Sequence, residues 1–119
     1  MVHRRTVGAV LLAAGQSTRM GQLKALLPWQ GKPLLVHQLD ALLEAGVACV
    51  VVVLGHQAEL LKPLAEGKPG AAVVLNPHYM QGKTTSIKAG ISSLPPDVTD
   101  ILILAVDQPR SGRCLKALV

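Results

Sequence analysis

Hydrophobic residues occur in four near-continuous runs of strand length, without regular alternation with polar residues. The runs are Val7–Ala13, Ala48–Leu54, Ala71–Leu75 and Ile101–Val106. A strand has this composition when both of its faces are covered, as in a parallel sheet that has helices on each side. The pattern therefore predicts an open, mainly parallel sheet with helices on both faces.

Amphipathic segments between the runs predict the helices. Leu35, Leu39 and Leu42 form one apolar stripe of a helix that has Pro33 in its first turn and ends near Ala45. The other predicted helices are 58–65, which Pro63 should shorten or kink, 84–93, and one that starts at 115–118. Strands that alternate with helices indicate βαβ units, and the whole chain, 1–119, fits a single α/β domain.

Composition narrows the classes of ligand. Half of the 119 residues are hydrophobic, with one Trp, one Tyr and no Phe, so the core is aliphatic. The net charge of +5 is spread along the chain and favours an acidic ligand such as a polyphosphate. A nucleic-acid partner is not expected, because there is no dense Lys/Arg stripe and there are no stacking aromatics.

The cysteines and the first hydrophobic run bear on location. Cys49 and Cys114 lack metal-ligand spacing, and Cys49 reads as a buried, reduced thiol. Residues 7–14 are too few to span a membrane and precede no signal-peptide cleavage pattern, so we expect a cytoplasmic chain without a membrane partner.

The segment after the first run carries candidate phosphate ligands. Gly15, Gly21, Arg19 and Lys24 lie in a loop that follows the end of a predicted strand. Ligands of open α/β sheets bind beyond the carboxyl ends of the strands, and small residues let the backbone approach a phosphate. From composition alone, a solvated turn whose two cations face water explains the loop equally well.

Asp107 ends the last hydrophobic run, directly before Gln108 and Pro109. A carboxylate fixed at a strand end suits Mg²⁺, which prefers oxygen ligands. The alternative is an Asp that caps a turn before a proline.

Gly82-Lys83-Thr84 imitates the end of a phosphate-binding P-loop. That motif needs a glycine five positions before Gly82, where this chain has Pro77, and the residues between them are bulky. A P-loop is therefore not predicted.

The segment Leu12 to Lys24 resembles the signature Leu-Ala-Ala-Gly-x-Ser-x-Arg-Met-Gly-x-x-Lys of nucleotidyltransferases related to molybdenum-cofactor cytidylyltransferase. Every fixed position matches. Further matches lie at 26–28, 31–34, 53–56, 76–77, 82, 86, 89–90 and 107–109, so the resemblance covers nearly the whole chain in the right order. It implies a Rossmann-like fold of the nucleotide-diphospho-sugar transferase type. Family members run further, so the chain is expected to be a domain that is incomplete at its C-terminal end.

The resemblance also implies site residues. The nucleotide-binding set is Ala13, Ala14, Gly15, Ser17, Arg19, Lys24, Gly82, Thr84 and Ser86. The catalytic set is Arg19, Lys24 and Asp107, in which the two cations hold the triphosphate and Asp107 binds Mg²⁺. Lys83 stands where the family often has Met, and we expect its side chain to face solvent.

The implied activity is transfer of CMP from CTP to the phosphate of a molybdopterin-type cofactor, with release of pyrophosphate. CTP is favoured over GTP because the guanylyltransferase branch tends to have Ala-Gly-Gly where this chain has Ala13-Ala14-Gly15. A molybdoenzyme or its chaperone is the protein partner that the resemblance implies. The alternatives are a guanylyl- or sugar-phosphate nucleotidyltransferase, and a module that binds nucleotide without turnover.

Overall fold

The structure is a computed structural model that describes residues 6–14, 18–19, 22–23, 28–29, 31–56 and 58–105. Its strands are β1 Val7–Ala13, β2 Thr18–Arg19, β3 Gln22–Leu23, β4 Pro28–Trp29, β5 Lys32–Pro33, β6 Cys49–Leu54, β7 Ala71–Leu75 and β8 Asp100–Ala105. Its helices are α1 Leu34–Glu44, α2 Ala58–Ala65, the 3₁₀ helix η2 Tyr79–Gln81, and α3 Lys83–Ser92.

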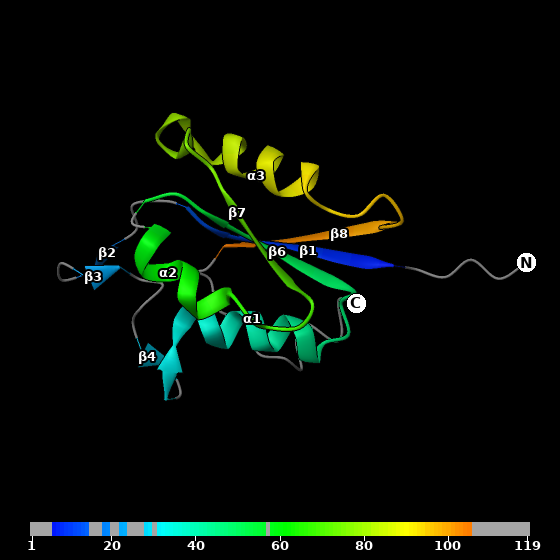
Figure 1. The fold of residues 1–119 in the computed structure, drawn as a ribbon, viewed down its shortest axis with the longest axis horizontal. Helices are drawn as coiled ribbons and strands as arrows, with labels where there is room; N and C mark the ends of the chain where they lie inside the picture. Colours follow the sequence, from blue (N-terminus) through cyan, green and yellow to red (C-terminus); the bar gives the residue numbers. More distant parts are fainter. Residues whose placement is uncertain are drawn as a thin grey trace, which may run out of the picture.

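The four long strands form one parallel sheet in the order β7-β6-β1-β8. Leu12 of β1 is aligned with Val53 on one side and with Ala105 on the other. The chain moves outward from β1 through β6 to β7 and then crosses back to β8, so the strand order reverses at β1 (Figure 1). The predicted open parallel sheet is confirmed, and a strand was found in each of the four hydrophobic runs.

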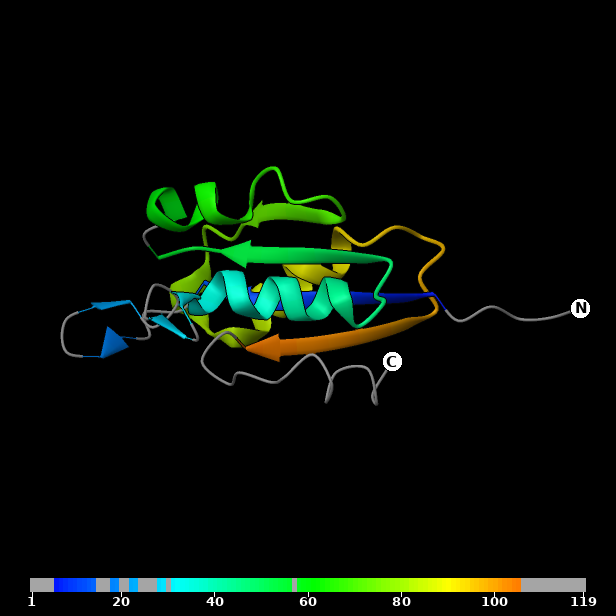
Figure 2. The same cartoon turned by 90° about the horizontal axis from the view of Figure 1, so that it is seen from below.

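Helices cover both faces of this sheet. Figure 1 shows α3 on one side and α1 with α2 on the other, and in Figure 2 α1 lies in front of the sheet and runs along the strands. Alternate residues of each strand enter opposite cores. Leu11, Val52 and Leu54 pack toward α1 and α2, whereas Val10 and Val53 pack toward α3. This is why the strand sequences are hydrophobic without alternation.

The helices differ from prediction only at their ends and at one proline. Pro33 lies just before α1, at its N-cap, and not in the first turn. Pro63, which was predicted to shorten or kink α2, lies inside the helix and does not shorten it. The bond that it cannot make would go to the carbonyl of Glu59, and both residues are exposed, so water can satisfy that carbonyl.

The paired short strands β2–β3 and β4–β5 were not predicted. The expected helix from 115 and the end of the last hydrophobic run at Val106 lie outside the described residues, as does Cys114. Cys49 is a free, partly buried thiol, and burial, followed by the charge of Asp97, raises its pKa. None of the described helices is long and apolar enough to cross a membrane.

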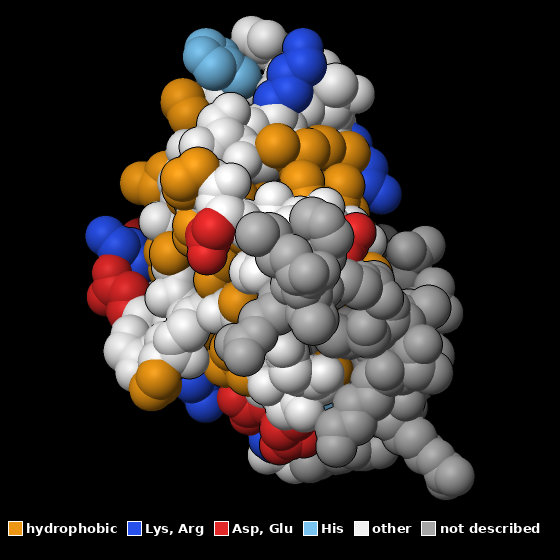
Figure 3. All heavy atoms as spheres, turned by 90° about the vertical axis from the view of Figure 1, so that its right-hand side faces the viewer, with side chains coloured by type: hydrophobic (Ala, Val, Ile, Leu, Met, Phe, Trp, Pro, Cys, Tyr) orange, Lys and Arg blue, Asp and Glu red, His pale blue; other side chains and the backbone are white. Residues whose placement is uncertain are grey.

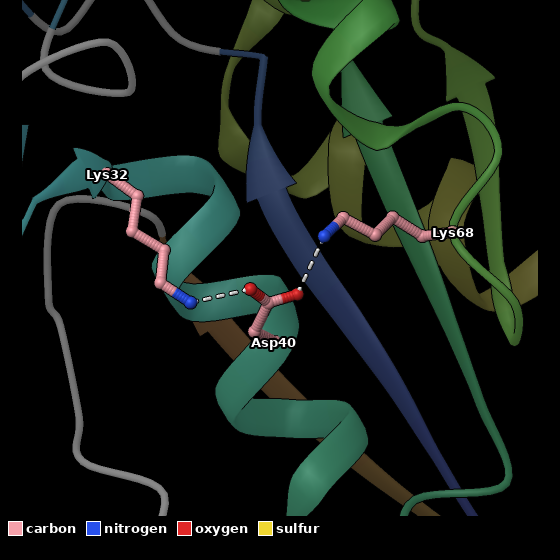
Figure 4. A network of polar contacts seen from close by, with 3 residues as sticks. All are labelled: Lys32, Asp40 and Lys68. Carbon is pink, nitrogen blue, oxygen red and sulfur yellow. Dashed lines mark hydrogen bonds and ion pairs between the residues drawn. The ribbon is translucent and has the colours of Figure 1, made fainter.

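An ion-pair network joins three elements on the α1 side (Figure 4). Asp40 of α1 accepts a hydrogen bond from Lys32 of β5 at 2.8 Å and another from Lys68, which follows α2, at 3.0 Å. Burial acts most strongly and raises the pKa of the Asp40 carboxyl, but the two lysines together lower that pKa below its ordinary value. Lys32, one of the family-matching residues, therefore ties the β4–β5 pair to α1.

Candidate functional site

The carboxyl ends of the four parallel strands lie along one edge of the sheet. Ala14 follows β1, Gly55 and His56 follow β6, and Asn76 follows β7. The β2–β3 pair and η2 lie on this same side in Figure 1. Because β1 and β8 are neighbours where the strand order reverses, their carboxyl ends mark the position at which open α/β sheets bind ligands.

The strand ends at this edge are held together by close contacts. The backbone N–H of His56 donates to the carbonyl of Ala14 at 3.0 Å. A Cβ atom on Gly55 would lie 2.7 Å from the ring of Tyr79, so only glycine leaves room for that ring. The His56 and Tyr79 rings are 6.0 Å apart at their centroids. The segment after β7 is therefore packed onto the end of β6.

The N-terminus of α3 starts at the same edge. Gly82 precedes the helix with φ of 120°, a conformation that favours glycine, and no side chain caps the helix. Lys83 and Thr84 are exposed, as expected for Lys83. The first N–H groups of an α-helix attract negative charge or carbonyl oxygen, so this turn suits a polar part of a ligand.

A buried polar cluster lies beneath this turn. Asn76 and Ser86 are each 4% exposed. The Asn76 side-chain amide donates to Thr85 Oγ1 at 2.9 Å and to Ser86 Oγ at 2.8 Å, and its oxygen accepts from the His78 N–H at 2.9 Å. Sequence reasoning gave Asn76 no role, although an Asn before a proline at a strand end is a signal for such a side-chain turn.

The structure describes part of the predicted site. Ala13, Ala14, Gly82 and Thr84 all lie at the carboxyl edge, whereas Ser86 lies one turn further into α3 and directs its hydroxyl to Asn76. Arg19 belongs to β2, where its backbone pairs with that of Gln22. The remaining predicted residues lie outside the described ones: Gly15, Ser17, Lys24 and Asp107.

A resident metal cluster is not found among the described residues, which contain no group of three or more His, Cys, Asp or Glu side chains suited to a metal ion. Asp107 follows Ala105, the last residue of β8, by two positions. Mg²⁺ in nucleotide sites is commonly held by one or two carboxylates together with substrate phosphates, so a single carboxylate would be enough for this chemistry.

The P-loop alternative does not fit the segment before α3. Residues 77–81 form a turn and the 3₁₀ helix η2, in which Tyr79 packs on Gly55. The opposite end of the molecule, which faces the viewer in Figure 3, presents both acidic and basic side chains among hydrophobic and polar ones.

The parallel sheet and its strand order define an α/β protein of the Rossmann-like class. The family model of the MobA-like NTP transferase domain matches residues 9–119. The chain therefore belongs to the MobA-like NTP transferase family, which confirms the resemblance in the sequence.

Relatives with different printed activities match the chain. It is 37% identical over 109 residues to a molybdenum cofactor guanylyltransferase of Xanthomonas euvesicatoria, covering 92% of this chain and 51% of that protein. It is 36% identical to the bifunctional protein GlmU of Pelobacter propionicus, and this match covers 87% of this chain and 23% of that protein. It is 30% identical to a molybdenum cofactor cytidylyltransferase of Escherichia coli, and this match covers 74% of this chain and 45% of that protein.

A solved nucleotidyl transferase from Methanothermobacter has the same fold, with a TM-score of 0.80 and 31% identity. The match covers 94% of this chain and 56% of that one. The chain thus spans about half of the length of the molybdenum cofactor transferases that it matches.

Proposed function

We propose that the chain is the nucleotide-binding half of a nucleotidyltransferase that transfers CMP from CTP to the phosphate of a molybdopterin-type acceptor and releases pyrophosphate. The observation that carries this proposal is the register of β1 and β8, which aligns Leu12 with Ala105. The signature loop after Ala14 and the carboxylate of Asp107 therefore follow neighbouring strand ends, where a nucleotide and its metal ion can be held together.

The loop after β1 would bind the phosphates. Ala13 and Ala14 are small and buried at the strand end, so a nucleotide can approach the backbone closely. Gly15 and Ser17 would continue this surface. Arg19 and Lys24 would neutralise the triphosphate and the leaving pyrophosphate, since charge stabilisation is the main contribution that a protein makes to such a transfer.

The turn before α3 would bind the base side of the nucleotide. Gly82 offers backbone that no side chain covers, and Thr84 offers an exposed hydroxyl. Asp107 would hold Mg²⁺, which supplies positive charge to the phosphate oxygens when it is bound. Ser86 would contribute from below the turn, through Asn76.

A guanylyl transfer is the second candidate, because the guanylyltransferase relative is 37% identical and the cytidylyltransferase relative 30% identical. We favour CTP on the alanine at position 14, the residue that differs from the Ala-Gly-Gly pattern of the guanylyl branch. A Cβ atom at this position is buried in the core beneath α3, so it changes the shape of the strand end itself.

The test is a calorimetric titration of the chain with CTP and with GTP, with and without Mg²⁺. An Arg19→Ala/Lys24→Ala variant should lose magnesium-dependent binding. A Lys62→Ala/Lys88→Ala variant, which removes the same charge from exposed positions on α2 and α3, should keep it. Preference for GTP would replace the cytidylyl proposal with the guanylyl one, and absence of binding to either nucleotide would overturn both.

A further inference from the structure

Asn76, which follows β7, makes hydrogen bonds to the end of β6, to the turn at His78 and to α3 at the carboxyl edge. Its backbone N–H donates to the carbonyl of Leu54 at 2.7 Å, which continues the β6–β7 pairing. Its side-chain oxygen accepts from His78, and its amide group donates to Thr85 and Ser86 of α3. The side chain is almost fully withdrawn from water, so these bonds are the ones that satisfy its polar atoms.

The Thr85 hydroxyl links Asn76 to Gly82 by hydrogen bonds. The Thr85 hydroxyl accepts from Asn76 and donates its single hydrogen to the carbonyl of Gly82 at 2.7 Å, with the carbonyl of His78 at 3.0 Å as the alternative acceptor. Gly82 has no side chain with which to cap α3, and a Cβ atom at Gly82 would meet no neighbour within 4 Å. The position of the Gly82 peptide therefore depends on the hydrogen bonds beneath it.

We propose that Asn76 is a positioning residue, which fixes the backbone of 82–84 for nucleotide binding by way of Thr85 and does not itself touch the nucleotide. This inference rests on the proposed function for its biological meaning. Ser86 anchors the other hydrogen of the Asn76 amide and so sets the rotation of the amide group. The hydroxyl of Ser86 is a second component of the support and not a ligand.

The sharpest variant is Thr85→Val, which keeps the shape of the side chain and removes only the hydroxyl that links Asn76 to Gly82. Thr85→Ser retains the hydroxyl and serves as the conservative rescue. Ser92→Ala removes an exposed hydroxyl at the far end of α3, away from the buried cluster. Thr85→Val should accelerate amide hydrogen exchange at Gly82 and at residue 85, whose N–H groups are hydrogen-bonded, by about 10-fold in the free chain, and Thr85→Ser and Ser92→Ala should leave it near wild type.

The same variants are then titrated with CTP and Mg²⁺. Thr85→Val should weaken binding by about 5- to 10-fold, as expected for the loss of one hydrogen bond that orders the site, and Thr85→Ser should restore it. Unchanged exchange at Gly82 and at residue 85 in Thr85→Val, or unchanged affinity in a chain that binds CTP, would overturn the inference. If the wild-type chain bound no nucleotide, the proposed function would fail, whereas altered exchange would still support the role of Asn76 in holding this backbone.

Discussion

The two faces of the parallel sheet are covered by different kinds of residue. The face toward α1 and α2 packs on leucines, and Leu35, Leu39 and Leu42 are each fully buried. The face toward α3 meets small and polar residues of the helix, such as Ser86 and Gly90, both of which are buried. Toward β8 this second face is less well covered, since Ile101 is 46% and Ile103 42% exposed.

The face of the sheet that contributes most to stability is therefore not the face that carries the candidate ligand site. Large aliphatic side chains on the α1 side bury the most apolar surface, which is the main source of folding free energy. Small residues on α3 let that helix lie close to the strands, so that its first turn is held at the carboxyl edge by polar contacts. The face that contributes less to the core is the one that carries Gly82 and Asn76.

The largest effect is expected from neighbouring residues of β8 that point to opposite faces. Leu104, which is 7% exposed, packs in the core with α1 and α2. Leu104→Ala should lower the free energy of unfolding by about 2–3 kcal/mol, because it leaves a cavity in a well-packed core. Ile103→Ala should lower it by only about 0.5–1 kcal/mol, because that residue is already 42% exposed to water. Denaturant unfolding of both variants provides the measurement.

Equal losses in the two variants would contradict the comparison, because they would mean that the α3 face is covered as completely as the other. The pair controls for position in the sheet, since both residues lie on the same strand and pair with adjacent residues of β1.

An intermediate effect on stability is expected where α3 lies close to the strands, and its sign should depend on the side chain at position 10. A Cβ atom at Gly90 would collide with Val10 Cγ1 and would lie 3.1 Å from Val53 Cγ2. Gly90→Ala should therefore destabilise the chain by about 1 kcal/mol, as the cost of overpacking exceeds the helix propensity that alanine adds. In a Val10→Ala background the collision is removed, and Gly90→Ala should stabilise by up to about 1 kcal/mol.

A double-mutant cycle of Gly90→Ala and Val10→Ala measures this reversal. If Gly90→Ala stabilised the wild-type chain, α3 would lie further from the sheet than the structure has it.

The sheet could be predicted from the sequence because its signal is local. Each hydrophobic run covers one strand. A strand between two layers of helices is buried on both faces, so its residues are hydrophobic without alternation. The β2–β3 and β4–β5 pairs could not be predicted, since strands of two residues have no periodicity. The effect of Pro63 on the length of α2 could not be predicted, because the cost of an interior proline depends on whether the freed carbonyl reaches water, which the sequence does not state.

The sequence indicated at which edge of the sheet the candidate site lies, but not which side chains of α3 face the sheet. Gly82 and Thr84, which the family resemblance implied, lie at the carboxyl edge, but Thr84, Thr85 and Ser86 cannot be told apart in the sequence, where they form a run of hydroxyl residues. The helical periodicity of α3 distinguishes Ser86 from Thr84 and Thr85. Ser86 and Gly90 are four residues apart and therefore share the face of the helix that packs on the sheet. The Asn76 cluster also depends on the path of the chain between β7 and α3.

The smallest effect concerns the polar interactions of Asp40 on the α1 side, which are partly exposed, in contrast to the buried amide of Asn76. The pKa of Asp40 is lowered on folding by Lys32 and Lys68, against the raising effect of burial. The carboxylate therefore stabilises the fold above the ordinary pKa of 3.8, and this contribution is lost as the pH falls through the lower folded value. Asp40→Asn should cost about 1 kcal/mol or less at neutral pH.

The measurement is the difference in unfolding free energy between wild type and Asp40→Asn as a function of pH. This difference should shrink as the pH falls below the ordinary pKa of 3.8 and through the lower pKa of Asp40 in the folded chain. Glu66→Gln is the matched control, because Glu66 pairs with Lys62 at 3.3 Å between side chains that are both about half exposed, and its loss should have almost no effect. A difference that stayed constant into acid would mean that Asp40 acts through its shape and not its charge. The α1 side would then be held by apolar packing alone, and the contrast with the polar support beneath α3 would be sharper still.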